Sequence, residues 1–122
     1  MPASQTFSKE ERLCSRKVIS QLFDGRNSFS LVAFPLRVVC MPAEKGASQL
    51  LLSVPKRCFK HAVMRNRVKR QLREAYRRHK DLLPSQPLYL AMIWLDDKLH
   101  ETAKVEQKVM TLMTRINERV TP

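Results

Sequence analysis

The sequence predicts a single α/β domain, a two-layer sandwich in which helices pack on a small mixed sheet. Two patterns support this class: apolar residues at helical spacing in 9–23, 60–82 and 105–120, and strand-like runs in 29–41, 49–54 and 88–95. The order is therefore helix, two or three strands, helix, strand, helix. Because 122 residues suit one core, we assign 1–122 to one domain and expect flexible ends at 1–7 and 120–122.

The first helix is expected over 9–23. Ser8 followed by Glu11 matches a capping box, in which each side chain bonds the other's backbone N–H at a helix start. Gly25 provides a stop signal after the last apolar residue of the segment.

The segment 29–41 alternates in the manner of a strand with one buried face. Its apolar even positions are Val32, Phe34, Leu36, Val38 and Cys40. Pro35 donates no ladder hydrogen bond and predicts an edge, a bulge or a break. A connection over 41–48 leads to a second strand over 49–54, and we expect the two strands to form a hairpin.

The second half of the chain predicts helix, strand, helix. A long helix over 60–82 ends before Pro84 and Pro87. The run LYLAMIWL over 88–95 is apolar throughout, which is typical of a central strand covered on both faces. We expect Asp96 and Asp97 to cap the last helix rather than to bind a metal. The residues expected to face the core from that helix are Val105, Val109, Leu112, Met113, Ile116 and Val120.

The charge of the chain points to a polyanionic partner. Lys and Arg number 23 against 11 Asp and Glu, a formal net charge of +12. Nucleic acid is the first candidate and an anionic membrane surface the second, with a merely soluble basic protein as the plainest alternative. The chain has no run resembling a signal peptide or a membrane span, so we expect a cytoplasmic protein with no membrane partner. Three widely spaced cysteines, Cys14, Cys40 and Cys58, are expected to be reduced thiols.

The basic residues concentrate in 56–80, which holds eleven Lys or Arg and one acid, Glu74. At about 100° per residue, one arc of this helix is mostly apolar: Met64, Val68, Leu72, Ala75, Tyr76 and His79. The opposite arc, here called the basic face, comprises Asn66, Lys69, Arg70, Arg73, Arg77 and Lys80.

Phosphate binding explains the basic face better than solvation does. A solvated face usually mixes signs, because opposite charges one turn apart stabilise a helix and like charges repel. Arginine binds phosphate bidentately and stacks on unpaired bases. Asn66 is a poor helix-interior residue, and its amide is explained equally by a local backbone bond and by a bond to RNA.

The sequence predicts no catalytic site and no metal site in the protein. His61, His79 and His100 are scattered, and none has a Ser, Cys or carboxylate at a spacing typical of a triad. Acids are too scarce for the converging carboxylates that two-metal phosphodiester cleavage requires.

The stretch LSVPKRCFKHAVMRNRVKRQLR, residues 52–73, closely resembles the signature segment of the bacterial ribonuclease P protein subunit. The shared features are a strand, a Lys-Arg pair, and then Arg-Asn-Arg-x-x-Lys-Arg on one helix. The segment FSKEERLCSRKVISQLF, residues 7–23, resembles the opening of the same family. The likeness therefore covers most of the chain.

This resemblance implies an αβββαβα order with a left-handed crossover, against the usual right-handed rule. It also implies an endoribonuclease whose catalytic groups are held by an RNA subunit and whose Mg²⁺ is held by that RNA and the substrate, and it implies no protein partner. The implied partners are the catalytic RNA and precursor tRNA, whose 5′ leader is removed. The residues implied to contact the catalytic RNA are Arg65, Asn66, Arg67, Lys69, Arg70, Arg73 and Arg77. Those implied to lie near the leader are Ile19, Phe23, Lys56, Arg57 and Lys60.

The chain departs from the family pattern at two places. The family often has two phenylalanines on the first helix, where this chain has Ile19 and Phe23, so only Phe23 offers a ring for stacking. Cys58 and Phe59 stand where many members have a small residue, which changes the expected loop geometry.

Two other functions are weighed against this one. A free-standing structural or ribosome-associated RNA-binding protein would use the same basic helix without depending on a leader. A DNA-binding factor is disfavoured, because the basic helix lacks the short turn and partner helix of a helix-turn-helix.

Overall fold

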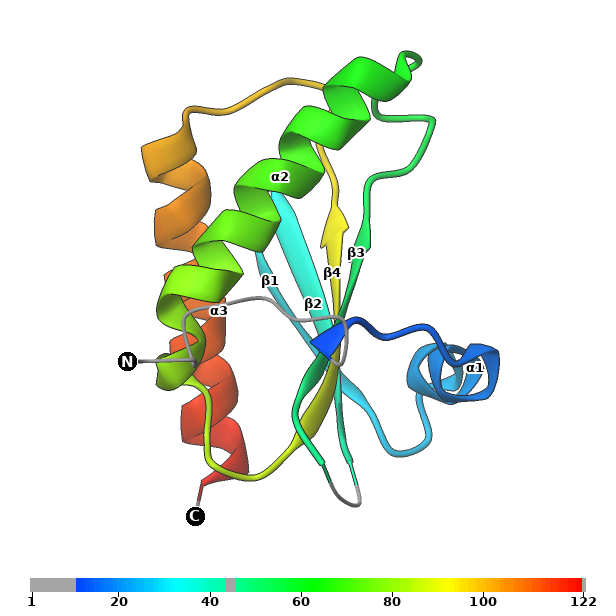
Figure 1. Ribbon diagram of the computed structural model, residues 1–122, viewed down its shortest axis with the longest axis vertical. Coiled ribbons are helices and arrows are strands. Elements are labelled where there is room, and N and C mark those ends of the chain that lie inside the picture. The colour runs from blue at the N-terminus through cyan, green and yellow to red at the C-terminus, as the bar shows by residue number, and fades with distance from the viewer. Residues whose placement is uncertain (1–10, 44–45, 122) are drawn as a thin grey trace.

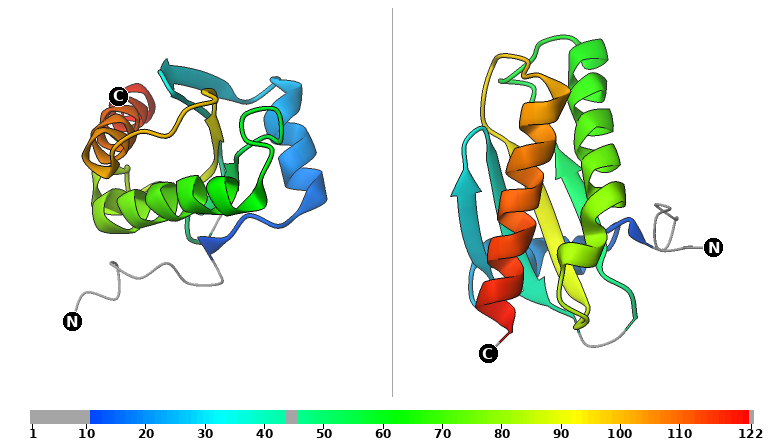
Figure 2. Two further views of the ribbon diagram at one scale, coloured as in Figure 1. Left: turned by 90° about the horizontal axis from the view of Figure 1, so that it is seen from above. Right: turned by 90° about the vertical axis from the view of Figure 1, so that its left-hand side faces the viewer.

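The computed structural model describes residues 11–43 and 46–121 and has the order αβββαβα (Figure 1). The elements are α1 (Arg16–Asp24), β1 (Phe29–Ala33), β2 (Leu36–Pro42), β3 (Gln49–Ser53), α2 (Ala62–His79), the 3₁₀ helix η3 (Lys80–Leu82), β4 (Leu88–Trp94) and α3 (Thr102–Val120). Seen from above, α2 and α3 lie on one side of the sheet and α1 on the other (Figure 2, left). The predicted α/β class is confirmed.

The four strands form a mixed sheet in the order β1-β2-β4-β3. β4 pairs antiparallel with β2 and parallel with β3. The predicted hairpin between 29–41 and 49–54 is therefore wrong, because β4 lies between these two segments. The physical reason is that β4 is apolar on both faces and is most stable at the centre of the sheet.

The connection from β3 through α2 to β4 is left-handed. With α2 and α3 toward the viewer, β1 is at the left edge and β3 at the right (Figure 2, right). The chain leaves the upper end of β3, descends through α2 and enters β4 to the left of β3. The handedness implied by the family resemblance is confirmed, against the right-handed rule for parallel strands.

Pro35 breaks the predicted 29–41 strand into the hairpin of β1 and β2. The peptide bond between Phe34 and Pro35 is cis, and Ala33 pairs with Leu36 across the turn. Because the turn restarts the alternation, odd positions of β1 and even positions of β2 face the core. Val32 and Phe34, predicted to be buried, are more than half exposed for this reason.

The first helix begins later than predicted. Ser15 caps α1, since its Oγ accepts a hydrogen bond from the Val18 N–H at 3.3 Å. Gly25 ends α1 with a φ of 82°, as predicted. Ser8 lies outside the described residues, and the segment 11–15 runs along the sheet edge instead of forming α-helix.

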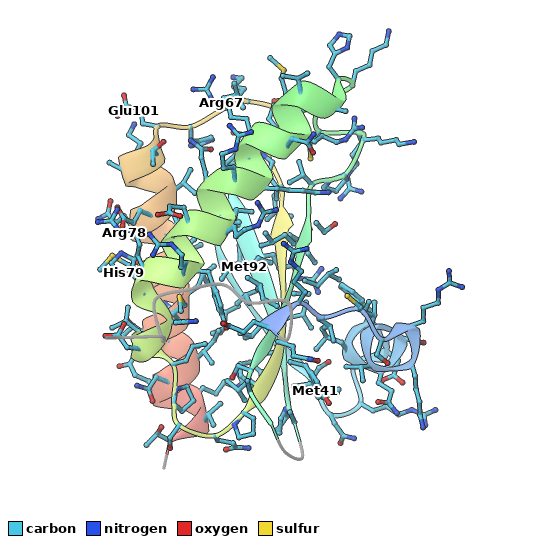
Figure 3. All side chains as sticks on the ribbon, in the orientation of Figure 1. Met41, Arg67, Arg78, His79, Met92 and Glu101 are labelled. Carbon is cyan, nitrogen blue, oxygen red and sulfur yellow. The ribbon has the colours of Figure 1, made fainter. Side chains whose placement is uncertain are left out.

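Two apolar clusters hold the layers together. The larger one lies between the sheet and α2 with α3, and includes Met92 and the fully buried Trp94. The smaller lies between α1 and the opposite face, with Leu22 and Met41 in it. In Figure 3, Met92 lies on the side of the sheet toward α2, and Met41 lies lower in the sheet.

Helix α3 begins at a different cap residue from the one predicted from the sequence. Glu101, not Asp96 or Asp97, is the N-cap residue. Asp96 instead accepts from His100, whose Nε2 lies 2.7 Å from its Oδ2, and this bond is the main reason that the pKa of Asp96 is lowered. At the other end, Val120 closes α3 and packs against the larger cluster, while 1–7 lies outside the described residues.

The three cysteines are free thiols. Cys14 is exposed, and burial raises the pKa of Cys40 to about 12. The Cys58 thiol is buried, and its burial raises its pKa as well.

Candidate nucleic-acid interface

Helix α2 packs on the sheet through the apolar arc predicted from the sequence. Val68, Leu72, Ala75 and Tyr76 are buried against the strands. Met64 is exposed, contrary to prediction, because α2 begins beyond the ends of the strands (Figure 1). His79 is half-buried, with Nε2 at 2.7 Å from Oε2 of Glu106 on α3.

Most of the basic face of α2 is open to solvent. Asn66, Arg70 and Arg73 are exposed, and Lys69 is half-buried. Arg77 is engaged locally, since its Nε donates to Oε2 of Glu74 at 3.0 Å, and this pairing lowers the pKa of Glu74. The face therefore keeps a surplus of positive charge along successive turns of one helix.

Arg65 and Arg67 leave α2 on opposite flanks of the basic face. Arg65 projects toward the preceding loop, where its Nη1 donates to the carbonyls of Phe59 at 2.8 Å and Lys60 at 3.0 Å. Arg67 is exposed and lies on the side of α2 that faces α3, as does Arg78 (Figure 3). The Arg-Asn-Arg segment therefore wraps around the start of the helix, because neighbouring helical residues project about 100° apart.

Lys80 does not belong to the basic face, contrary to prediction. It lies in η3, past the end of α2, and its Nζ bonds the carboxylate of Glu11. The helical periodicity that assigned it to the basic face does not continue there, because the helix changes to 3₁₀ geometry.

The loop between β3 and α2 presents three further cations. Lys56, Arg57 and Lys60 are all exposed. Cys58 and Phe59 between them are buried, and Cys58 Sγ lies 3.6 Å from the Trp94 carbonyl oxygen. These two residues anchor the loop in the core and thereby direct its cations outward.

On the other face of the sheet, a small cavity of about 120 Å³ lies beside the end of α1. Phe23 is 48% exposed at its rim. Ile19, one turn earlier, packs against the smaller apolar cluster. The strands contribute Ser30, Arg37 and Val39 to the cavity wall.

Arg37 is a candidate site residue that sequence reasoning did not select. It is exposed and pairs across the sheet with Val32 on one side and Ile93 on the other. Paired residues point to the same face of a sheet, so these side chains form one row on the α1 side. The available signal was its place as a charged residue between the buried positions 36 and 38.

The histidines of the described residues do not gather into a metal site. His61 is the N-cap residue of α2, His79 is the last residue of that helix, and His100 lies in the loop between β4 and α3. Across 11–43 and 46–121, no three side chains of His, Cys, Asp or Glu form a group able to hold a metal ion. No helix in the same residues has both the length and the apolar character needed to cross a membrane.

The fold and this surface define a class of protein: a small α/β domain with a left-handed crossover, whose crossover helix exposes a cationic face. The family model of Ribonuclease P matches residues 7–117. The chain therefore belongs to the ribonuclease P protein family.

Relatives and solved structures agree with this assignment. The ribonuclease P protein component of Porphyromonas gingivalis is 40% identical over 124 residues, covering 94% of this chain and 89% of that protein. The ribonuclease P protein of Thermotoga maritima superposes with a TM-score of 0.75 at 25% identity, covering 87% of this chain and 97% of that chain. The Staphylococcus aureus protein superposes equally well, with a TM-score of 0.75 at 20% identity over 88% of this chain and 95% of that one, and supports the fold alone.

Proposed function

We propose that this chain is the RNA-binding protein subunit of ribonuclease P and assists a catalytic RNA in removing the 5′ leader of precursor tRNA. Family membership supports the tRNA-processing role. The observation that carries the RNA-binding role is the cationic face of α2, opposite a buried face that fixes the helix on the sheet. A folded polyanion removes the repulsion among these charges and releases its own counterions on binding.

The catalytic RNA docks on α2. Arg70 and Arg73 bind phosphates from the centre of the basic face, with Asn66, Lys69 and Arg77 beside them. Arg65 and Arg67 contact the RNA from the two flanks, where planar guanidinium groups suit both phosphates and unpaired bases.

The single-stranded leader lies on the α1 side of the sheet. Phe23 offers a ring for base stacking, and Ile19 adds apolar contact beside it. Lys56, Arg57 and Lys60 neutralise phosphates where the leader approaches the catalytic RNA. Arg37, in the sheet row between these two places, supplies a further phosphate contact.

The chemical step belongs to the RNA subunit. Mg²⁺ would be held by that RNA and the substrate and would activate water for hydrolysis of one phosphodiester, with a 5′ phosphate left on the tRNA. The protein contributes phosphate neutralisation and leader binding, both of which strengthen substrate binding when Mg²⁺ is scarce.

A reconstitution assay tests the proposed function. Adding the chain to its cognate RNA subunit is expected to restore leader cleavage at low Mg²⁺ and to favour binding of precursor over mature tRNA. The RNA alone and RNA plus an unrelated basic protein are the controls. Absence of stimulation contradicts the proposal, and tight RNA binding without leader preference would indicate a free-standing RNA binder.

Phe23→Ala is expected to reduce the preference for precursor over mature tRNA by about tenfold, since one stacked base contributes roughly 1–3 kcal/mol. The measurement is the ratio of dissociation constants for the two tRNAs with the assembled enzyme. Met110→Ala is the matched control, because Met110 is an exposed apolar residue on α3, across the sheet from α1. An unchanged ratio in Phe23→Ala would remove Phe23 from the leader site.

A further inference from the structure

The segment 11–15, here called the N-terminal strap, is fixed to the free edge of β3. Arg12 forms a parallel bridge with Leu50, and the Leu13 N–H donates to the Leu50 carbonyl at 3.0 Å. Leu13 is buried in the cluster between α1 and the sheet. The strap thus extends the sheet by one short pairing before the chain enters α1 (Figure 1).

An ion pair ties the start of the strap to the end of α2. Nζ of Lys80 lies 2.8 Å from one Glu11 carboxylate oxygen and 2.9 Å from the other. Their side chains are only 15% and 13% exposed, so solvent screens the pair much less than it screens a surface pair. Charge-assisted hydrogen bonds in such surroundings are short and directional. Removing one partner leaves the other charge partly buried without its counterion.

The Glu11–Lys80 pair lies near a buried residue of α2, the helix that carries the basic face. Tyr76 is fully buried on the inner side of α2, and its pKa is raised, mainly by burial and further by the nearby Glu11 charge. Glu11 therefore meets the end of α2 at a packed part of the molecule rather than on an open surface.

α1 follows the strap directly and has little buried surface of its own. α1 has nine residues, and Leu22 is the only one of them that is buried. Leu13 is followed directly by Cys14, the cap Ser15 and then α1, so a shift of the strap moves the start of the helix. Phe23 lies near the end of that helix.

We infer that Glu11 and Lys80 are positioning residues for leader binding: their ion pair fixes α1, and with it Phe23, relative to α2. This inference rests on the proposed function, because α1 carries part of the leader surface and α2 the surface for the catalytic RNA. Neither residue contacts RNA in this role, and Lys80 is used within the protein despite its place in the basic segment.

Charge-reversal variants of Glu11 and Lys80 distinguish a positioning role from a general effect of net charge on RNA binding. Glu11→Lys makes the protein more basic and Lys80→Glu makes it less basic, so their effects on RNA affinity through net charge are opposite. Both single variants are expected to lower the preference for precursor over mature tRNA by about tenfold. The double variant, with the pair reversed, is expected to restore it.

The matched control is Glu106→Lys, which makes the same substitution in an ion pair between α3 and Arg78, on the other side of α2. This control is expected to leave the preference for precursor over mature tRNA unchanged. Glu11→Gln, which keeps the side-chain length, and Lys80→Met, which keeps most of it, provide milder disruptions if a reversal fails to fold. Circular dichroism and thermal melting establish folding before each binding measurement.

The outcomes are distinct. If the wild-type protein shows no leader preference, the proposed function fails. If it shows that preference and the folded single variants keep it, or if the reversed pair does not recover it, the positioning role of Glu11 and Lys80 is overturned.

Discussion

Replacing both Arg70 and Arg73 by glutamine is expected to weaken binding of the chain to the RNA subunit on the order of 100-fold. Both side chains are exposed at the centre of the basic face of α2. A bond to a charged group contributes about 1.5 kcal/mol or more, so two lost phosphate contacts remove about 3 kcal/mol. Measuring the dissociation constant across salt concentrations is the test, because the slope of log K against log salt should fall by about two.

The matched control for this variant is Lys98→Gln with Lys104→Gln. Both lysines are exposed, and both lie outside α2. The control removes the same amount of charge, so it separates a docking face from a general effect of net charge. Equal weakening in the two double variants would contradict docking on α2. Arg65 is less suitable for this test, because it also donates hydrogen bonds to two backbone carbonyls of the preceding loop.

Trp94→Ala is expected to lower the free energy of unfolding by about 3–5 kcal/mol, the usual cost of removing a large buried ring. Trp94 is fully buried at the end of β4, in the cluster that joins the sheet to α2 and α3. The His100 ring packs against it in a T-shaped arrangement, with ring centroids 5.3 Å apart. Its backbone carbonyl also accepts a hydrogen bond from the Cys58 thiol, which anchors the loop between β3 and α2.

Urea unfolding followed by circular dichroism measures this effect, because the variant removes the only tryptophan of the chain. Trp94→Phe is the matched control. It keeps most of the ring volume and removes an indole N–H that is buried without a hydrogen-bond partner in the described residues. We expect its cost to be well below that of Trp94→Ala. A loss under about 1 kcal/mol in Trp94→Ala would show that the cluster does not depend on this ring.

Features that depend on neighbouring residues were predictable from the sequence. The buried arc of α2 followed from helical period, and residues such as Val68 and Leu72 occupy the predicted side. The stop at Gly25 and the break at Pro35 followed from backbone conformations that these residues favour. The apolar run of β4 predicted a strand covered on both faces, and it occupies the centre of the sheet.

Features that depend on distant partners were not predictable in the same way. The alternation of 29–41 continued through Pro35 in the sequence, whereas the turn exchanged the faces and exposed Val32. The capping-box pattern gave no sign that Glu11 would pair with Lys80 instead. Arg37 entered the candidate site only when the fold paired β2 with β1 and placed Arg37 in the wall of the cavity at the end of α1.

By itself, the sequence determined the element types, the single basic helix and the family, because periodicity, turn residues and motif spacing are properties of adjacent positions. Only the tertiary structure decided which strand lies beside β3, which cations reach solvent and where α1 is anchored. Those outcomes depend on competition between segments far apart in the chain. A strand joins the partner that buries most apolar surface, and Lys80 leaves the predicted basic face because the carboxylate of Glu11, distant in the sequence, pairs with it.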